Sequence, residues 1–284
     1  MLPEFDLLKN SLESPTLSAE QRLALLGALQ KIEKSQARLD FNYNRALKDK
    51  QTLSVLLQRI SEDLTAAREE IEQLHQESER LLLNILPAPI ASRLKSGEEV
   101  IADSYQDVTV LFADIVGFTP LSSQVTPQQL VHMLDDIFSL FDALAEQNGL
   151  EKIKTVGDSY MVVGGLLAAR PDHPEAVARM ALQMLEALAQ FNHVNQQQLN
   201  MRIGINTGPV VAGVIGRKKF SYDLWGDTVN IASRMESHGV AGCIHMTAAT
   251  CDRLHGTFTF AERGSIEVKG KGLMTTYFLT GKQI

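Results

Sequence analysis

Two aspartates that follow strand-like stretches are the residues of this sequence best suited to chemistry. Asp114 ends the apolar, β-branched run 108–113, which predicts a strand buried on both faces. Asp158 lies in a tight turn after Gly157, between two further strand-like runs. An ionised carboxylate at the end of a buried strand is costly unless a positive charge meets it. Two such carboxylates, brought together by the fold, would suit a pair of hard cations.

Helix signals separate the two aspartates along the chain. Thr126 and Gln129 have the spacing of a capping box, and Pro127 occupies the first helical position. An apolar face of period 3.6 follows, and the Asn-Gly pair at 148–149 supplies a stop signal. We therefore expect a helix of about six turns from residue 127, each turn taking about 3.6 residues.

The remaining pattern predicts an α+β domain. A strand pair about Gly157, a helix after Pro174 and a strand over 201–206 complete the order strand, helix, hairpin, helix, strand. This order predicts a mixed sheet with the helices packed on one side of it. The end of the first strand and the hairpin turn can then be neighbours, with Asp114 beside Asp158.

The first 86 residues have a different periodicity. From Leu25 to Ile85, apolar residues recur at alternating steps of four and three, interrupted only by Gln36, Lys50 and Ser78. So narrow a seam matches a two-stranded coiled coil better than a globular core. A helical hairpin that folds back on itself is the alternative, and a break near residue 42 is conceivable.

Two prolines mark the end of the helical region. Pro87 and Pro89 cannot donate the backbone bond that a helix interior needs, which places the domain boundary near residue 86. The predicted organisation is a polar segment over 1–20, a helical coiled coil over 21–86, a linker over 87–105 and the α+β domain over 106–284.

Composition narrows the functional classes. The 284 residues carry a net charge of −7, which argues against non-specific binding to nucleic acids or anionic membranes. Cys243 and Cys251 fit no metal spacing, and reduced thiols in a cytoplasmic protein are expected. No run approaches the length of a membrane span, and the N-terminus has no pattern of a secretion signal.

Five motifs together resemble the class III nucleotidyl cyclases. The resemblance covers about residues 85–280, with the motifs in the order of that family. In sequence order they lie at 112–119, 152–158, 202–213, 222–235 and 268–272. The resemblance implies a ferredoxin-like mixed sheet and conversion of ATP to 3′,5′-cyclic AMP and pyrophosphate.

The resemblance assigns a metal site to the opening aspartates. It implies two Mg²⁺ or Mn²⁺ ions held by Asp114, Asp158 and the backbone carbonyl of Ile115. Such ions lower the pKa of the attacking ribose hydroxyl and neutralise the triphosphate. The alternative for each aspartate is a carboxylate that only hydrogen-bonds its own turn.

Lys154 and Asp223 stand at the positions that select the base in this family. Adenine offers an acceptor at N1 and a donor at N6, which an ammonium and a carboxylate complement. Guanylyl-specific members carry Glu and a small polar residue there, so the pair indicates ATP. The alternative is that Lys154 is a solvated strand residue paired with Glu151.

The remaining implied roles concern ribose and phosphates. Asn230 and Arg234 stand four apart on a predicted helix and so share one face. The resemblance implies that Asn230 orients the ribose and that Arg234 stabilises charge at the α-phosphate in the transition state. Lys269 would bind the terminal phosphates, although spacing alone does not choose between it and Lys271.

The family resemblance also implies a homodimer with two shared sites. In the family, the metal-binding residues of one subunit face the base- and phosphate-binding residues of the other. This chain carries both sets, and a parallel coiled coil has the matching two-fold symmetry. The coil could then relay a signal from an upstream sensor to the sites.

Position 209 is proline, whereas some heteromeric relatives carry a phosphate-facing arginine there.

Other functional classes remain open alternatives. A guanylyl cyclase conflicts with Lys154 and Asp223. A nucleotide-binding regulatory domain without activity is compatible with the fold, because a fold does not guarantee chemistry. A pure coiled-coil scaffold leaves the five motifs unexplained. A diguanylate cyclase would need a glycine-glycine-acid-acid turn, which 156–159 does not provide.

Overall fold

The computed structural model describes residues 3–13, 15–123, 125–167, 170–216 and 219–283. The chain divides into two compact units, Met1–Leu81 and Leu82–Ile284. The first unit contains helix α1 (Pro3–Leu12) and most of helix α2 (Ala19–Leu83). Within the described residues, no helix combines the length and apolarity needed to cross a bilayer.

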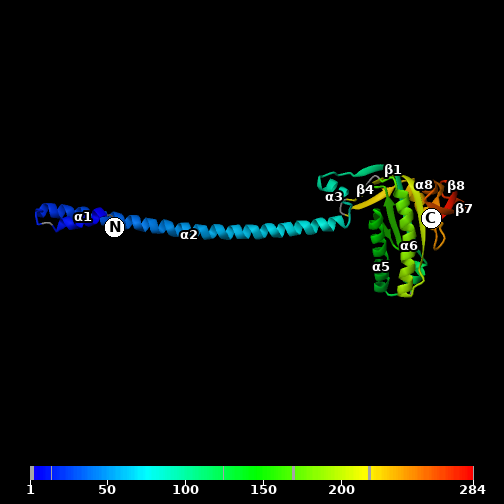
Figure 1. Ribbon diagram of the computed structural model, residues 1–284, viewed down its shortest axis with the longest axis horizontal. Helices are drawn as coiled ribbons and strands as arrows, with labels where there is room; N and C mark the ends of the chain where they lie inside the picture. The colour runs from blue at the N-terminus through cyan, green and yellow to red at the C-terminus, as the bar shows by residue number, and fades with distance from the viewer. Residues whose placement is uncertain (1–2, 14, 124, 168–169, 217–218, 284) are drawn as a thin grey trace. The chain divides into compact units, whose positions relative to one another are not determined.

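Helix α2 is a single uninterrupted helix of 65 residues (Figure 1). The alternative of a hairpin within 21–86 is therefore wrong, and the helix has no break near residue 42. Helix α1 lies in the segment predicted only to be polar, and Lys9 approaches Glu33 of α2 to 3.9 Å. Leu57 and Leu64 are 58% and 66% exposed, so the apolar seam is uncovered there in the single chain, whereas Leu29 of the same seam is buried, at 6% exposure.

The second unit is built on an eight-stranded sheet, and its strands are β1 (Ala102–Val116), β2 (Glu151–Val156), β3 (Ser159–Gly164), β4 (Asn200–Ile215), β5 (Ser221–Trp225), β6 (Ile244–Thr247), β7 (Phe258–Val268) and β8 (Gly272–Lys282). The strand order is β2-β3-β1-β4-β6-β8-β7, and β5 pairs with β4. Strands β4 and β6 are parallel and the other pairs antiparallel, so the prediction of a mixed sheet is confirmed.

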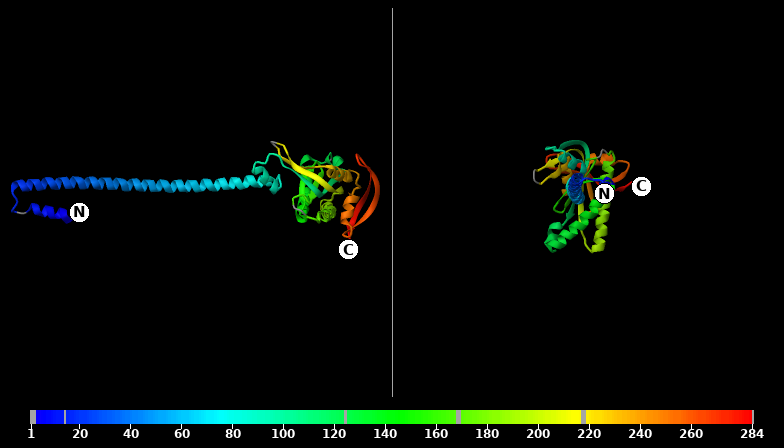
Figure 2. Two further views of the ribbon diagram at one scale, coloured as in Figure 1. Left: turned by 90° about the horizontal axis from the view of Figure 1, so that it is seen from above. Right: turned by 90° about the vertical axis from the view of Figure 1, so that its left-hand side faces the viewer.

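The helices of this unit are α3 (Ala88–Lys95), α4 (Phe118–Ser122), α5 (Pro127–Asn148), α6 (His173–Asn195), α7 (Asp227–Ser237) and α8 (Ala248–Leu254). Helices α5 and α6 lie side by side, as Figures 1 and 2 show. The capping box of Thr126 and Gln129 is present, and Gly149 ends α5 in the left-handed conformation, as predicted.

The helices cover both faces of the sheet, so the prediction of helices on one side was wrong. Leu111 and Ala113 of β1 belong to a core with α5 and α6, whereas Val108 and Val110 belong to a second core. Ile90 of α3 and Ala232 of α7 are members of that second core. Over 108–111 both faces of β1 are buried, and each face packs against its own set of helices.

The end of β1 is less enclosed than its sequence predicts. Residues 108–111 are fully buried, but Phe112 and Asp114, which share a face by the two-residue alternation of a strand, are only half-buried. The strand therefore ends at an accessible position on the sheet. Both cysteines are free, and Cys251 is buried, in accord with the prediction of reduced thiols.

Candidate active site

The fold brings Asp114 and Asp158 together. Asp114 pairs in register with Ser159 across β1 and β3, which places the hairpin residue Asp158 directly beside it. Burial raises the pKa of Asp158, and the nearby charge of Asp114 raises it further, against opposing effects of its own backbone amide and of Arg202. The predicted neighbourhood of the two carboxylates is thus present in one chain.

Arg202 supplies the positive charge that a strand-end aspartate requires. Its Nη2 donates to Asp114 Oδ2 at 2.7 Å, from the position on β4 that pairs with Asp114. Its Nε lies 3.0 Å from Glu236 Oε1 of α7, but neither atom has an aligned hydrogen bond, so this contact is electrostatic. Sequence reasoning singled out neither Arg202 nor Glu236.

Glu236 is the most perturbed carboxyl group of this cluster. Burial raises its pKa to about 7, and the charge of Asp114 acts in the same direction, while Arg202 opposes the shift. Its side chain is only 11% exposed. The cluster therefore holds three carboxyl groups around one guanidinium, which leaves an excess of negative potential for a cation to neutralise.

The carboxylate oxygens of this cluster are the kind of ligand that suits Mg²⁺ or Mn²⁺. The described residues form no group of three or more His, Cys, Asp or Glu side chains that could hold a metal alone. Mg²⁺, however, is usually held by one or two carboxylates together with waters and substrate phosphates. Asp114 and Asp158 provide that pair. The ladder to β3 ends at Asp114, so Ile115 has no strand partner on that side, and its carbonyl role stays a prediction.

Lys154 and Asp223 form an ion pair within the chain. Lys154 Nζ donates to Asp223 Oδ2, and the other carboxylate oxygen accepts the backbone N–H of Leu224 at 2.8 Å. The alternative partner Glu151 is therefore wrong. The side chains of Lys154 and Asp223 are 37% and 17% exposed, so both remain within reach of a ligand.

Helix α7 and the β7–β8 turn form a polar pocket of about 520 Å³. Asn230 and Arg234 both line it, which confirms that they share a face of α7. Lys269 and Lys271 line it from the turn. Lys271 forms an ion pair with Asp227 at the start of α7, whereas Lys269 has no ion-pair partner among the residues described.

The predicted residues thus form three groups, and one chain does not unite them. The pair Asp114 and Asp158 adjoins Arg202, and the pair Lys154 and Asp223 joins β2 to β5. The pocket at Asn230 includes neither metal-site aspartate in its described lining. A single chain therefore presents parts of a site rather than one enclosed cavity.

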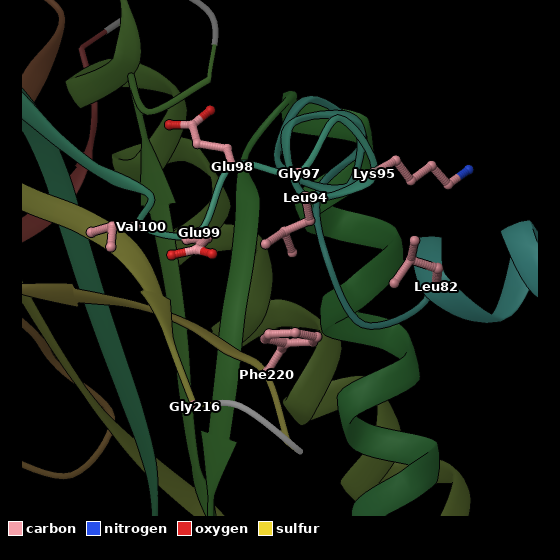
Figure 3. Close-up of a pocket in the computed structure, with 9 residues that line it drawn as sticks. All are labelled: Leu82, Leu94, Lys95, Gly97, Glu98, Glu99, Val100, Gly216 and Phe220. Atoms are coloured by element: carbon pink, nitrogen blue, oxygen red, sulfur yellow. The ribbon is translucent and has the colours of Figure 1, made fainter.

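A larger, mostly apolar hollow of about 840 Å³ lies elsewhere in the second unit. The side chains of Leu82, Leu94 and Phe220 lie around it, as Figure 3 shows. None of the predicted site residues is among its described lining. Its charged lining residues are Lys95, Glu98 and Glu99, and this excess of carboxylates suits a triphosphate poorly. Size alone therefore does not identify the place of the chemistry.

Sequence comparison matches residues 100–281 to the family "Adenylate and Guanylate cyclase catalytic domain". The chain is 50% identical over 223 residues to the adenylate cyclase of Mycobacterium tuberculosis. The match covers 78% of this chain and 50% of that protein, so the chain spans about half the length of this curated relative.

Two solved structures show the same fold. The guanylate cyclase domain of RhGC from Catenaria anguillulae, in complex with GTP, has a TM-score of 0.62 and 39% identity, covering 64% of this chain and 100% of that one. The adenylyl cyclase CyaB from P. aeruginosa has a TM-score of 0.62 and 27% identity, covering 64% and 97%. The relatives therefore include enzymes named for each of the two nucleotides.

Proposed function

Because the chain belongs to the adenylate and guanylate cyclase catalytic domain family, we propose that it converts ATP to 3′,5′-cyclic AMP and pyrophosphate. The ribose 3′-oxygen attacks the α-phosphorus, its proton is released, and the bond from the α-phosphorus to the bridging oxygen breaks. Two Mg²⁺ or Mn²⁺ ions held by Asp114, Asp158 and the Ile115 carbonyl would supply charge neutralisation and a lowered hydroxyl pKa.

The other residues recognise and orient the nucleotide. Asn230 holds the ribose, so that the 3′-oxygen faces the α-phosphorus. Arg234, one turn further on the same face of α7, stabilises the charge that develops on the α-phosphate. Lys269 binds the terminal phosphates that leave as pyrophosphate.

The ion pair between Lys154 and Asp223 carries the choice of ATP. It holds a cationic donor and a carboxylate acceptor in one place, and adenine offers the complementary acceptor N1 and donor N6. Guanine, with N1–H and O6, would set donor against donor and acceptor against acceptor. A buried polar site discriminates strongly against such a mismatch, by about 10⁴-fold in favourable cases.

The active unit is proposed to be a homodimer with two sites. This arrangement accounts for the separation, within one chain, of the aspartate pair from the pocket at Asn230. In a two-fold dimer, the metal residues of one subunit would meet the nucleotide-binding residues of the other. The exposed seam of α2 supports association through a parallel coiled coil, and an upstream sensor could act through it.

A product assay tests the proposal directly. Purified protein is incubated with ATP or GTP and with Mg²⁺ or Mn²⁺, and cyclic AMP, cyclic GMP and pyrophosphate are measured. We expect cyclic AMP with equimolar pyrophosphate, and loss of both in Asp114→Ala. The absence of product from the unmodified protein with either metal would favour a nucleotide-binding regulatory domain.

A guanylyl cyclase is the second candidate, because the RhGC structure, with 39% identity to this chain, is that of a guanylate cyclase domain bound to GTP. The same assay separates the two candidates. A higher kcat/KM for GTP than for ATP would replace the adenylyl proposal with the guanylyl one.

A further inference from the structure

Helix α7 lies directly on the backbone of β4. A Cβ atom added at Gly204 would lie 2.0 Å from the backbone nitrogen of Glu236, and one added at Gly208 would lie 2.7 Å from Thr228 Oγ1. Both distances are far shorter than a carbon contact allows. The two glycines therefore let the two ends of α7 approach the strand, at sites four residues apart on β4.

Two hydrogen bonds hold the first turn of α7 against β4, and a third holds the Asn206 side chain that makes one of them. Asn206 Nδ2 on β4 donates to the carbonyl of Thr228 at 3.1 Å, and its Oδ1 accepts from Thr247 Oγ1 of β6 at 2.8 Å. Thr228 Oγ1 donates in turn to the carbonyl of Pro209 at 2.7 Å. Asn206 is 5% exposed, Thr228 4% and Thr247 1%. Asn206 thus connects two neighbouring strands to the helix.

The orientation of the Asn206 amide follows from its partners. The reverse orientation would place Oδ1 against the Thr228 carbonyl oxygen and leave two acceptors facing each other. The Thr247 hydroxyl could accept from Nδ2 as well as donate to Oδ1, so only the Thr228 carbonyl would lose its donor, and a buried carbonyl without a partner is costly. The observed orientation satisfies that carbonyl, so the contact with α7 is specified rather than incidental.

Further polar side chains extend this contact through the core. Thr250 donates to Thr207 at 3.1 Å, Thr207 contacts Thr109 at 2.8 Å, and Thr109 contacts His173 Nδ1 at 2.9 Å. All four residues are less than 9% exposed. Thr109 is connected to Asn206 through Thr207, Thr250 and Thr247, but none of its own hydrogen bonds among the described residues reaches α7. It therefore offers a matched comparison for the loss of one buried polar contact.

We propose that Asn206 is a positioning residue. It holds the first turn of α7 in place on β4 and thereby sets the positions of Asn230 and Arg234. The inference rests on the proposed function. Asn230 is two residues beyond Thr228, and Arg234 is one turn further. A shift of the first turn would move both side chains relative to the ribose and the α-phosphate. Because Asn230 aligns the 3′-oxygen for attack and Arg234 acts on charge that develops in the transition state, misplacement lowers kcat more than it changes KM.

The test compares Asn206→Asp with Thr109→Val in the full-length chain. Asn206→Asp keeps the shape and the acceptor but replaces the donor that faces the Thr228 carbonyl. We expect faster amide hydrogen exchange over 228–234 and a fall in kcat of about 10-fold to 100-fold with KM little changed. Thr109→Val should lower thermal stability without either effect. Unchanged exchange in α7, or an equal loss of kcat in Thr109→Val, would overturn the proposal.

A second comparison separates positioning from general destabilisation. In an Asn230→Ala background, Asn206→Asp should lower kcat by a smaller factor than in the unmodified chain, because one of the two placed side chains is already missing. An equal factor in both backgrounds would contradict the inference. Absence of turnover in the unmodified chain would contradict the cyclase proposal instead. Hydrogen exchange would still decide whether Asn206 holds α7 in position on β4.

Discussion

Lys154 on β2 donates a hydrogen bond to Asp223 on β5, across 69 positions of sequence. Their side chains are partly exposed, and a pair of this kind contributes little to folding stability, about 0–1 kcal/mol. The structural consequence is orientation: the ammonium and the carboxylate are held next to each other before any nucleotide arrives.

Exchanging this pair should change base preference. Combining Lys154→Glu with Asp223→Ser removes the donor for adenine N1 and the acceptor for adenine N6, and introduces a carboxylate that can accept from guanine N1–H. We expect kcat/KM for ATP to fall by at least about 100-fold, and the ratio of GTP to ATP turnover to rise. Steady-state kinetics with both nucleotides measures the ratio.

Lys152 provides the control for this exchange. It lies two residues earlier on β2 and pairs with Asp142 at 2.7 Å, away from Asp223. Lys152→Ala should leave the ratio of the two nucleotides unchanged. A ratio that moves equally in Lys152→Ala and in the exchanged pair would show that charge on β2, rather than base recognition, sets the preference.

The two lysines of the β7–β8 turn should differ in their effects. Lys271 is engaged by Asp227, whereas Lys269 lines the same pocket without an ion-pair partner among the described residues. Lys269→Ala should therefore raise KM for the nucleotide about tenfold, a loss of about 1.4 kcal/mol of binding, and Lys271→Ala should raise it less. Direct binding of pyrophosphate to the unmodified chain and to both variants measures the same contact without turnover. A larger effect of Lys271→Ala would reassign the phosphate contact to that residue.

Local signals in the sequence predicted the elements around the site well. The capping box at Thr126 and the glycine stop at Gly149 are local hydrogen-bonding and conformational preferences, so they could be identified without the fold. The neighbourhood of Asp114 and Asp158 was predicted from the order of elements instead, because it depends on the non-local pairing of β1 with β3, which sets Asp114 opposite Ser159.

Long-range choices could not be predicted in the same way. The order of elements does not state which face of the sheet a helix covers, and α7 lies opposite α5 and α6. The sequence did contain one signal for the packing of α7 on β4, namely Gly204 and Gly208, because glycines permit a helix to approach the strand backbone. Arg202 was missed because its carboxylate partner Asp114 is 88 positions away, and charge pairing leaves no periodic pattern.

Glu236 should make the stability of the metal-free protein depend on pH. Its pKa in the folded chain is about 7, above its ordinary value of 4.5, so the folded state holds the proton more tightly than the unfolded state does. The associated stability is complete below pH 4.5 and is lost as the pH rises through 7. Glu236→Gln, which cannot ionise, should escape this loss.

The expected difference has a definite sign. Relative to the unmodified chain, Glu236→Gln should gain free energy of unfolding as the pH rises from 4.5 to 7, by up to about 3 kcal/mol, since one pKa unit corresponds to about 1.4 kcal/mol. Urea unfolding in the presence of a chelator, at several pH values, measures this gain. Glu262→Gln, at a carboxyl group on β7, is the comparison. A difference that does not vary with pH would contradict the burial of an ionisable Glu236.

The uncovered seam of α2 predicts that self-association and turnover are linked. Leu57 and Leu64 lie on the seam and are 58% and 66% exposed in the single chain, whereas Val55 is 68% exposed but lies off it. In a two-stranded coil, a glutamate at either leucine would be buried without a partner. Leu57→Glu combined with Leu64→Glu should therefore weaken self-association at least about tenfold, and Val55→Glu should not.

Turnover should then follow the association equilibrium. If each site takes residues from two chains, the specific activity of the seam variant falls at low protein concentration and recovers as the concentration rises, because the coil supplies effective concentration to the catalytic units. Analytical ultracentrifugation and activity measured over the same concentrations test this link. A seam variant that dissociates while its specific activity stays constant would show that one chain is sufficient for the reaction. A variant that stays associated would show that the seam of α2 is not the contact between chains.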